Sequence, residues 1–225
     1  ELAQVMQASN QSNGMSGGRF DVTVAPLINL WGFGPKKPGE PIPSDDEIAT
    51  ALEDVGQATL LTLSSDPLTL TKGRPGVTVN LSAIAKGYGI DAVAATLDAN
   101  GVERYLVEIG GDLVAKGENA EGAPWSIGIE SPDASQETIE KIVPVSDLGL
   151  ATSGDYRNYI EEDGIRYSHI IDPTTGRPIT HKTSSVTVLA DNAMMADGLA
   201  TALLALGVDD GMALAESEGI AVFFI

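Results

Sequence analysis

The sequence predicts an α+β fold, with largely antiparallel sheets and helices packed against them. Strand-like runs outnumber helical ones, and most successive strand-like runs are separated only by the short turns typical of hairpins. Of the 225 residues, 43% are apolar, which is enough to bury a sizeable core. The chain contains no internal repeat and no linker long enough to separate two domains. We therefore expect a single domain over residues 1–225.

The first third of the chain is expected to hold two helices and one hairpin. Its opening segment is typical of the tail of a helix that ends at Asn13 and Gly14. The proline-rich stretch GPKKPGEPIPSDDE predicts a surface loop that leads into a helix over residues 45–55, with Ser44 as N-cap and acidic residues in the first turn. After it, ATLLTLSSDPLTLTK predicts two short strands around a Ser-Ser-Asp-Pro turn.

The next segment, VTVNLSAIAKGYGIDAVAATLDANG, changes its hydrophobic period. Val77 and Val79 alternate like strand residues, and apolar residues then recur with helical spacing until Asn100 and Gly101, so strand is expected to become helix across residues 80–82. Further strands are predicted at RYLVEIGGDLVAKG, WSIGIE, KIVPVS, YSHIID and SSVTVLA, with a loop at ATSGDYRNY. Two helices, MMADGLATALLALG and DDGMALAESEG, and the strand GIAVFFI complete the chain.

The charge of the chain excludes several kinds of partner. Lys and Arg number 13 against 32 Asp and Glu, a formal net charge of −19, which repels phosphate backbones and anionic lipid surfaces. An anionic small ligand therefore needs a metal ion, a helix N-terminus or a local cation such as Lys86 or Arg177 to reverse the local field. The excess of acidic residues therefore favours binding of a divalent cation. With no cysteine, disulfides and thiolate metal sites are excluded.

The two ends suggest a piece of a longer protein. The first residues lack the basic start and apolar centre of a signal peptide, and the last ones stop within an apolar strand. We expect that the domain lacks its N-terminal part and is truncated at its C-terminus, with targeting signals outside the chain.

One of the two histidines, His169, lies in the stretch YSHIIDPTTGRPI. If this stretch is extended, Tyr167, His169 and Ile171 share one face of the strand. Asp172 starts a turn by side-chain hydrogen bonding, and Gly176 supplies its left-handed position. Either His169 is a half-buried strand residue, the commoner case, or it is a chemical group at the mouth of a turn.

Asp197 and Thr201 stand four residues apart near the start of an apolar helix. This spacing places a carboxylate and a hydroxyl on one helix face, and both are hard oxygen ligands suited to Mg²⁺ or Ca²⁺. The commoner alternative is that Asp197 stabilises the helix N-terminus and Thr201 bonds a helix carbonyl.

The strand-to-helix turn NLSAIAKGYG could bind an anion at its amides, with Lys86 adding a charge-assisted contact. Ser82 is a candidate N-cap, and glycines such as Gly87 would let another backbone or a ligand approach closely. IGGDL and ATSGDYRNY are glycine-bearing bends beside acidic or hydroxyl groups, each compatible with an ordinary bulge or hairpin loop. The aromatic residues of GGRFDVTVAPLINLWGFGP could pack in the core or stack on a flat ligand.

Six of these stretches, taken together and in order, resemble the ApbE family of FAD:protein FMN transferases over nearly the whole chain. They are FDVTVAPLINLWGFGP, VNLSAIAKGYGID, YLVEIGGDL, ATSGDYRNY, YSHIIDPTTGRPI and ADGLATALLALG. The resemblance implies an ApbE-like, T-fold-like architecture. It also implies a Mg²⁺-dependent enzyme that cleaves the diphosphate of FAD, attaches FMN through a phosphoester to a Thr or Ser of an acceptor protein, and releases AMP.

The resemblance also implies roles for individual residues. The cation would be held by the backbone carbonyl of Ala83, the carboxylate of Asp197 and the hydroxyl of Thr201. His169 would be the general base, because attack by an alcohol on phosphorus needs a proton acceptor. The implied FAD contacts are Phe20, Asp21, Val22, Asn80, Lys86 and the backbone of Ile171.

This chain departs from the family at two positions: many relatives have Asp where it has Asn80, and some have Glu or Gln where it has Lys86. Part of the family's FAD pocket also comes from residues upstream of Glu1. Two other functions stay open, a Mg²⁺-dependent FAD pyrophosphatase that yields FMN and AMP, and a non-enzymatic FAD carrier. The presence of both His169 and the Asp197/Thr201 pair argues against a carrier, which needs no base.

The resemblance implies acceptors among the subunits of the sodium-pumping NADH:quinone oxidoreductase and related electron-transfer complexes. It further implies a periplasmic protein, anchored to the inner membrane as a lipoprotein through a segment outside this chain.

Overall fold

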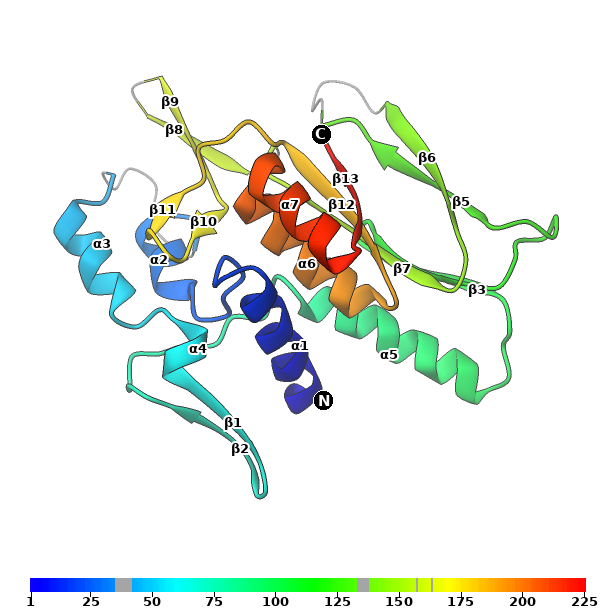
Figure 1. Cartoon of the computed structure of the whole chain (residues 1–225), viewed down its shortest axis with the longest axis horizontal. Helices are drawn as coiled ribbons and strands as arrows, with labels where there is room; N and C mark the ends of the chain where they lie inside the picture. Colours follow the sequence, from blue (N-terminus) through cyan, green and yellow to red (C-terminus); the bar gives the residue numbers. More distant parts are fainter. Residues whose placement is uncertain (35–41, 133–137, 157, 163) are drawn as a thin grey trace. The chain divides into compact units, whose positions relative to one another are not determined.

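The computed structural model describes residues 1–34, 42–132, 138–156, 158–162 and 164–225. These residues form two compact units, each built from two stretches of chain: Glu1–Leu81 with Asn158–Lys182, and Ser82–Arg157 with Thr183–Ile225. We name them the first and second unit. Figure 1 shows their helices and mostly antiparallel strands, which confirms the predicted α+β class.

The first unit is mainly helical and carries three small hairpins. Its elements are α1 (Leu2–Met15), α2 (Ala25–Leu30), α3 (Asp45–Leu52), α4 (Gln57–Leu60), β1 (Leu61–Ser65), β2 (Leu68–Lys72), β8 (Tyr159–Glu162), β9 (Ile165–Ser168), β10 (Ile171–Asp172) and β11 (Arg177–Pro178). The strands pair antiparallel as β1 with β2, β8 with β9, and β10 with β11.

Local sequence signals explain several of these elements. The Ser44 side chain accepts from the Glu47 amide while the Glu47 side chain accepts from the Ser44 amide, a capping box that starts α3 where predicted. Helix α3 ends at Leu52, three residues earlier than expected. Most of the predicted proline-rich loop lies outside the described residues. The predicted hairpin around Asp66 and Pro67 is confirmed as β1 and β2.

The turn after His169 also forms as predicted. Asp172 accepts from the Thr174 amide at 2.9 Å, and Gly176 has a φ of +71°. A Cβ on Gly176 would lie 2.6 Å from Ile48 Cγ2, so both the backbone conformation and the space require glycine. The indole of Trp31 donates to the Gly176 carbonyl at 2.8 Å, which ties the turn to the core. That core is built around Leu27, Trp31, Ile48 and Ile171.

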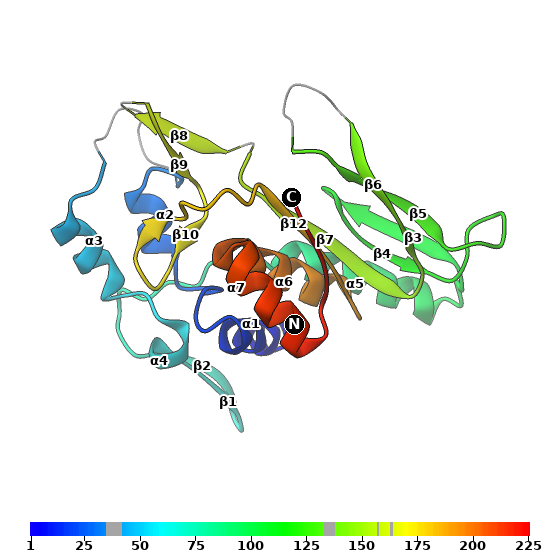
Figure 2. The same ribbon diagram turned by 45° about the horizontal axis from the view of Figure 1, so that its top comes forward.

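The second unit is a five-stranded antiparallel sheet in the order β13-β12-β7-β4-β3. Its elements are α5 (Ala85–Ala99), β3 (Tyr105–Ile109), β4 (Asp112–Lys116), β5 (Trp125–Glu130), β6 (Ile139–Val145), β7 (Leu148–Gly154), β12 (Ser185–Ala190), α6 (Ala193–Leu206), α7 (Val208–Glu218) and β13 (Ala221–Phe224). The β5–β6 hairpin covers one face of this sheet and helices cover the other (Figure 2).

Strand register decides which side chains meet the helices. Leu113 pairs with Leu150, and Leu150 pairs with Leu189, so these three lie on the hairpin face. One residue further along each strand, the side chains point to the opposite face. Asp112 of β4 and Ser153 of β7 therefore lie on the helix-covered face.

Four predictions about elements are wrong. Val77 and Val79 form no strand, and Ser82 is not the N-cap of α5, which begins after Ile84 without a side-chain cap. The first four residues of ATSGDYRNY belong to β7 and its end to β8, because tertiary pairing overrides the turn-forming composition. The expected continuous strand YSHIID breaks after Ser168 and resumes at Ile171. Within the described residues, no helix is long and apolar enough to cross a membrane.

Candidate functional site

The start of helix α6 is fastened to helix α5. A Cβ on Gly87 would lie 2.3 Å from the Ala193 carbonyl oxygen, so the two backbones approach as closely as glycine allows. The Asp91 carboxylate accepts from the amides of Ala193 and Met194, both at 2.9 Å, and burial raises the pKa of Asp91. The Asn192 side chain caps the same helix end. These contacts fix where the side chains of α6 lie relative to α5.

Asp197 is a buried carboxylate, 6% exposed, that faces the first turn of α5. Its Oδ2 accepts from the Gly87 amide at 2.9 Å, the one hydrogen bond that reaches it from the described residues. Burial raises the pKa of Asp197 to about 6, against the opposing effect of the Gly87 hydrogen bond. The alternative interpretation, in which Asp197 stabilises its own helix N-terminus, is wrong, because Asn192 and Asp91 hold that position.

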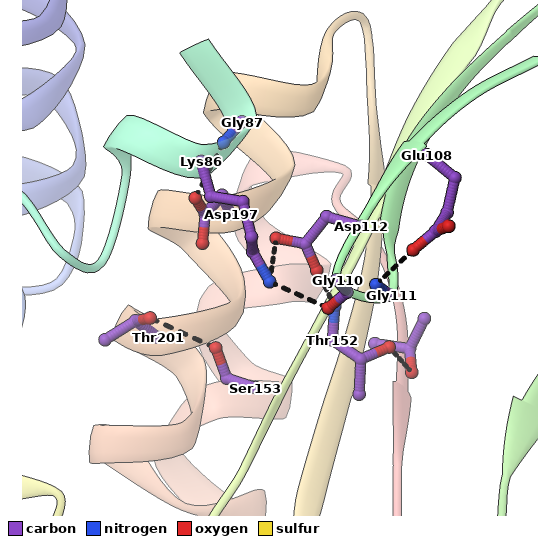
Figure 3. A network of polar contacts seen from close by, with 11 residues as sticks. Lys86, Gly87, Glu108, Gly110, Gly111, Asp112, Thr152, Ser153, Asp197 and Thr201 are labelled. Carbon is purple, nitrogen blue, oxygen red and sulfur yellow. Dashed lines mark hydrogen bonds and ion pairs between the residues drawn. The ribbon is translucent and has the colours of Figure 1, made fainter. Parts of the chain in front are cut away.

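A lysine and a second buried carboxylate lie beside Asp197. Lys86 Nζ is 2.9 Å from Asp112 Oδ2 and donates to the Gly110 carbonyl at 3.2 Å (Figure 3). Asp112 is 1% exposed, and its Oδ1 accepts from the Thr152 amide at 3.2 Å. Burial raises the pKa of Asp112, and Lys86 acts in the opposite direction. Two buried carboxylates and one ammonium leave this cluster electronegative.

Thr201 extends the cluster by one helical turn. Its hydroxyl points at the hydroxyl of Ser153 on β7, with 3.1 Å between the two oxygens (Figure 3). Thr201 therefore bonds a side chain of the neighbouring strand β7 and not a carbonyl of α6. Ala83 lies two residues before α5 begins, in the same unit. The second unit therefore holds the predicted residues Ala83, Lys86, Asp197 and Thr201.

The chemistry of these donors suits a hard cation. Among the described residues, no group of three or more His, Asp or Glu side chains could hold a metal ion, so a site must also use carbonyl or hydroxyl oxygens. The predicted set of Ala83 carbonyl, Asp197 carboxylate and Thr201 hydroxyl offers three such oxygens, the donor type that Mg²⁺ prefers. A buried carboxylate with a single hydrogen-bond donor would gain from a nearby cation. The residues present fit Mg²⁺.

The other predicted residues lie in the first unit. The side chains of Phe20 and Val22 are buried, each 2% exposed. Asp21 accepts from the amides of Thr23 and Gln57, both at 2.7 Å, and so caps the short helix α4. The second of these hydrogen bonds ties the segment from Phe20 to Val22 to the start of α4.

Asn80 and Ile171 also have defined places. The Asn80 amide donates to the Val22 carbonyl at 2.7 Å, which brings Asn80 beside the Phe20–Val22 segment. Ile171 is 6% exposed and packs in the core with Leu27 and Trp31. The first unit thus brings four of the predicted FAD contacts together around α4, while Ile171 lies in β10, just before the turn that starts at Asp172.

His169 has a defined tautomer. Its Nδ1 lies 2.8 Å from the Asn158 carbonyl oxygen, and since a carbonyl can only accept, Nδ1 carries the proton and Nε2 is the basic nitrogen of the neutral ring. The Phe33 ring packs edge-on against the imidazole, with ring centroids 6.2 Å apart. His169 lies in the break between β9 and β10, outside any strand.

A family model described as the ApbE family matches residues 1–224. The chain belongs to the ApbE family. A relative named FAD:protein FMN transferase, from Vibrio cholerae, is 49% identical over 98% of this chain and 65% of its own length. The flavin transferase ApbE structure from Vibrio cholerae superimposes with a TM-score of 0.87 at 47% identity, over 99% of this chain and 70% of the other. The ApbE protein structure from Thermotoga maritima has a TM-score of 0.88 at 30% identity, over 100% and 72%.

Three residues of this ApbE chain that shape the site were not singled out from the sequence: Asp91, Asp112 and Ser153. Asp112 and Ser153 lie in IGGDL and ATSGDYRNY, which the sequence marked only as glycine-bearing bends. Their contacts are with residues 26 and 48 positions away, so no local pattern could have indicated them.

Proposed function

We propose that the protein to which this chain belongs transfers FMN from FAD to a Thr or Ser hydroxyl of an acceptor protein. The chain spans 65% of the length of the Vibrio cholerae relative, which is named FAD:protein FMN transferase. The observation that supports the proposal is the buried cluster in which the carboxylates of Asp197 and Asp112 lie beside Lys86, a residue type able to contact a phosphate.

In the proposed reaction, the acceptor hydroxyl oxygen forms a bond to the phosphorus of the FMN half of FAD. The bond between that phosphorus and the bridging oxygen breaks, and AMP leaves with the bonding pair. His169 accepts the hydroxyl proton at Nε2, and the hydrogen bond from Nδ1 to the Asn158 carbonyl supports this role because it leaves Nε2 basic.

Mg²⁺ is the proposed cation, held by the Ala83 carbonyl, Asp197 and Thr201. When bound, it would supply positive charge that neutralises the diphosphate. Asp197 is suited to this because its charge is buried beside Asp112 and receives a single hydrogen bond from the described residues.

Six residues are proposed as contacts for FAD. Lys86 would bind a phosphate oxygen, a role supported by its place between Asp112 and the Gly110 carbonyl, which fix its ammonium group. The remaining proposed contacts are Phe20, Asp21, Val22, Asn80 and the Ile171 backbone.

Acceptors of the proposed kind are subunits of the sodium-pumping NADH:quinone oxidoreductase or of related electron-transfer complexes. We also propose that the protein is periplasmic and anchored by a lipid, because the family resemblance that suggests these acceptors also implies this location. Labelling of intact cells with a membrane-impermeant reagent would test the location.

The function is tested by incubating the protein with FAD, Mg²⁺ and an acceptor peptide that contains Thr or Ser, and measuring the peptide mass. We expect the peptide to gain one FMN group. His169→Ala should abolish this gain and leave FAD binding, measured by quenching of flavin fluorescence, within about threefold of wild type, because the ring is assigned to proton transfer.

Other outcomes separate the alternatives. Free FMN and AMP with an unmodified peptide would show that water is the acceptor, which makes the protein a FAD pyrophosphatase. Bound FAD with neither product would make it a carrier. Equal loss of FAD binding and transfer in His169→Ala would remove His169 from the role of base.

A further inference from the structure

The hydroxyl of Thr201 is held by a neighbouring strand. In a helix, a Thr hydroxyl commonly bonds the carbonyl four residues earlier, which for Thr201 is that of Asp197. In this structure the Thr201 hydroxyl instead bonds the Ser153 hydroxyl on β7, at 3.1 Å. Figure 3 shows the two side chains directed toward each other from α6 and β7. Ser153 therefore selects one of the orientations open to Thr201.

The contact follows from the way α6 runs along β7. At one end, a Cβ on Gly149 would lie 2.4 Å from the Ala193 amide nitrogen, so strand and helix touch there. From Ala193 to Thr201 the helix rises about 12 Å. From Gly149 to Ser153 the strand rises about 13 Å. The two distances match, so the second contact is set by the same packing as the first.

A hydroxyl that binds a metal ion needs a hydrogen-bond acceptor for its proton. A hydroxyl that gives a lone pair to a cation keeps its proton, and it is oriented by the acceptor to which it donates that proton. Ser153 Oγ is such an acceptor within hydrogen-bond distance of Thr201. Without it, the Thr201 hydroxyl is free to rotate toward the Asp197 carbonyl and away from the cation.

We propose that Ser153 is a positioning residue for divalent-cation binding, acting by orienting the hydroxyl of Thr201. The inference rests on the proposed function, in which Thr201 is a ligand of Mg²⁺. It adds a residue of β7 to a site otherwise built from α6 and the start of α5.

The test measures cation binding by the full chain without FAD, using Mn²⁺ detected by electron paramagnetic resonance and Mg²⁺ by calorimetry. Ser153→Ala should weaken binding by about tenfold, the usual effect of losing a partner of a metal ligand. Ser153→Thr, which keeps the hydroxyl, should restore most of the affinity.

Thr187→Val is the matched control. The hydroxyls of Thr152 on β7 and Thr187 on β12 are 2.8 Å apart, so this pair also starts from β7, but it lies on the opposite face of the sheet from Ser153. This variant removes a similar hydroxyl pair and should leave the Kd for Mn²⁺ unchanged.

A double-mutant cycle tests whether Ser153 affects cation binding through Thr201. In a Thr201→Ala background, Ser153→Ala should cause no further loss of affinity. An unchanged Kd in Ser153→Ala, an equal loss in Thr187→Val, a full additional loss in the Thr201→Ala background, or a wild-type protein that binds no divalent cation would each overturn the inference. Cation binding that depends on Ser153 but is accompanied by no flavin transfer would instead count against the proposed function alone.

Discussion

Two aspartates with the same exposure, Asp172 in the first unit and Asp197 in the second, differ in how they are satisfied. Each is 6% exposed. Asp172 pairs with Arg19 and accepts from the amide and the hydroxyl of Thr174, at 2.9 and 2.7 Å. Asp197 accepts from the Gly87 amide, its one donor among the described residues. Burial alone therefore does not distinguish them.

The difference shows how a structural carboxylate is told from one that is suited to bind a ligand. A buried charge is stabilised when donors saturate it, and Asp172 is saturated by its own turn and a nearby arginine. Asp197 keeps its charge in a poorly compensated place, which is why its pKa rises to about 6. Such a group is costly to the fold, and a cation would offset that cost.

Asp197→Asn is expected to have the largest effect on activity and little effect on stability. Transfer of FMN should fall by about a thousandfold or more, since a cation contributes several kcal/mol to charge stabilisation. With EDTA present, the free energy of unfolding in urea should be unchanged or higher, because a poorly paired buried charge is removed. A loss of stability with normal Mn²⁺ affinity would place Asp197 with Asp172 as a structural carboxylate.

Asp172→Ala is expected to show the reverse pattern. The free energy of unfolding should fall by about 3 kcal/mol, because Arg19 and both Thr174 donors lose their acceptor. Affinity for Mn²⁺ should stay at the wild-type value. A loss of stability below about 1 kcal/mol would mean that saturation by hydrogen bonds does not mark the structural carboxylate.

Asp91 accepts from two amides and is thus intermediate between Asp172 and Asp197 in its number of hydrogen-bond donors. Its substitution should have the smallest effect of the three, a change in how the free energy of unfolding depends on pH. Its pKa in the folded protein is raised, chiefly by burial, so the unfolded chain loses this proton first as the pH rises past about 4. The free energy of unfolding should therefore decrease with pH in this window, by at most about 1.4 kcal/mol per pH unit. Asp91→Asn should flatten the urea-derived stability profile between pH 4 and the raised pKa, and identical slopes would contradict the assignment.

Much of the fold was predictable because its signals are local. Ser44 and Glu47 mark the start of α3, Asp172 and Gly176 form the expected turn, and the period of the apolar residues locates α5, α6 and α7. The failures at Val77, Val79 and the first residues of ATSGDYRNY share a cause. Whether a segment becomes a strand depends on the strand it pairs with, and that partner is distant in sequence.

By itself, the sequence determined the α+β class, the turn after His169 and the four-residue spacing that puts Asp197 and Thr201 on one helix face. Only the tertiary structure decided what those side chains meet: Gly87 and the Lys86–Asp112 pair beside Asp197, and Ser153 beside Thr201. The physical reason is the separation along the chain between the residues that interact. Periodicity and turn chemistry act over a few residues, whereas charge and hydrogen bonding inside a core depend on segments that only packing brings within 3 Å or so.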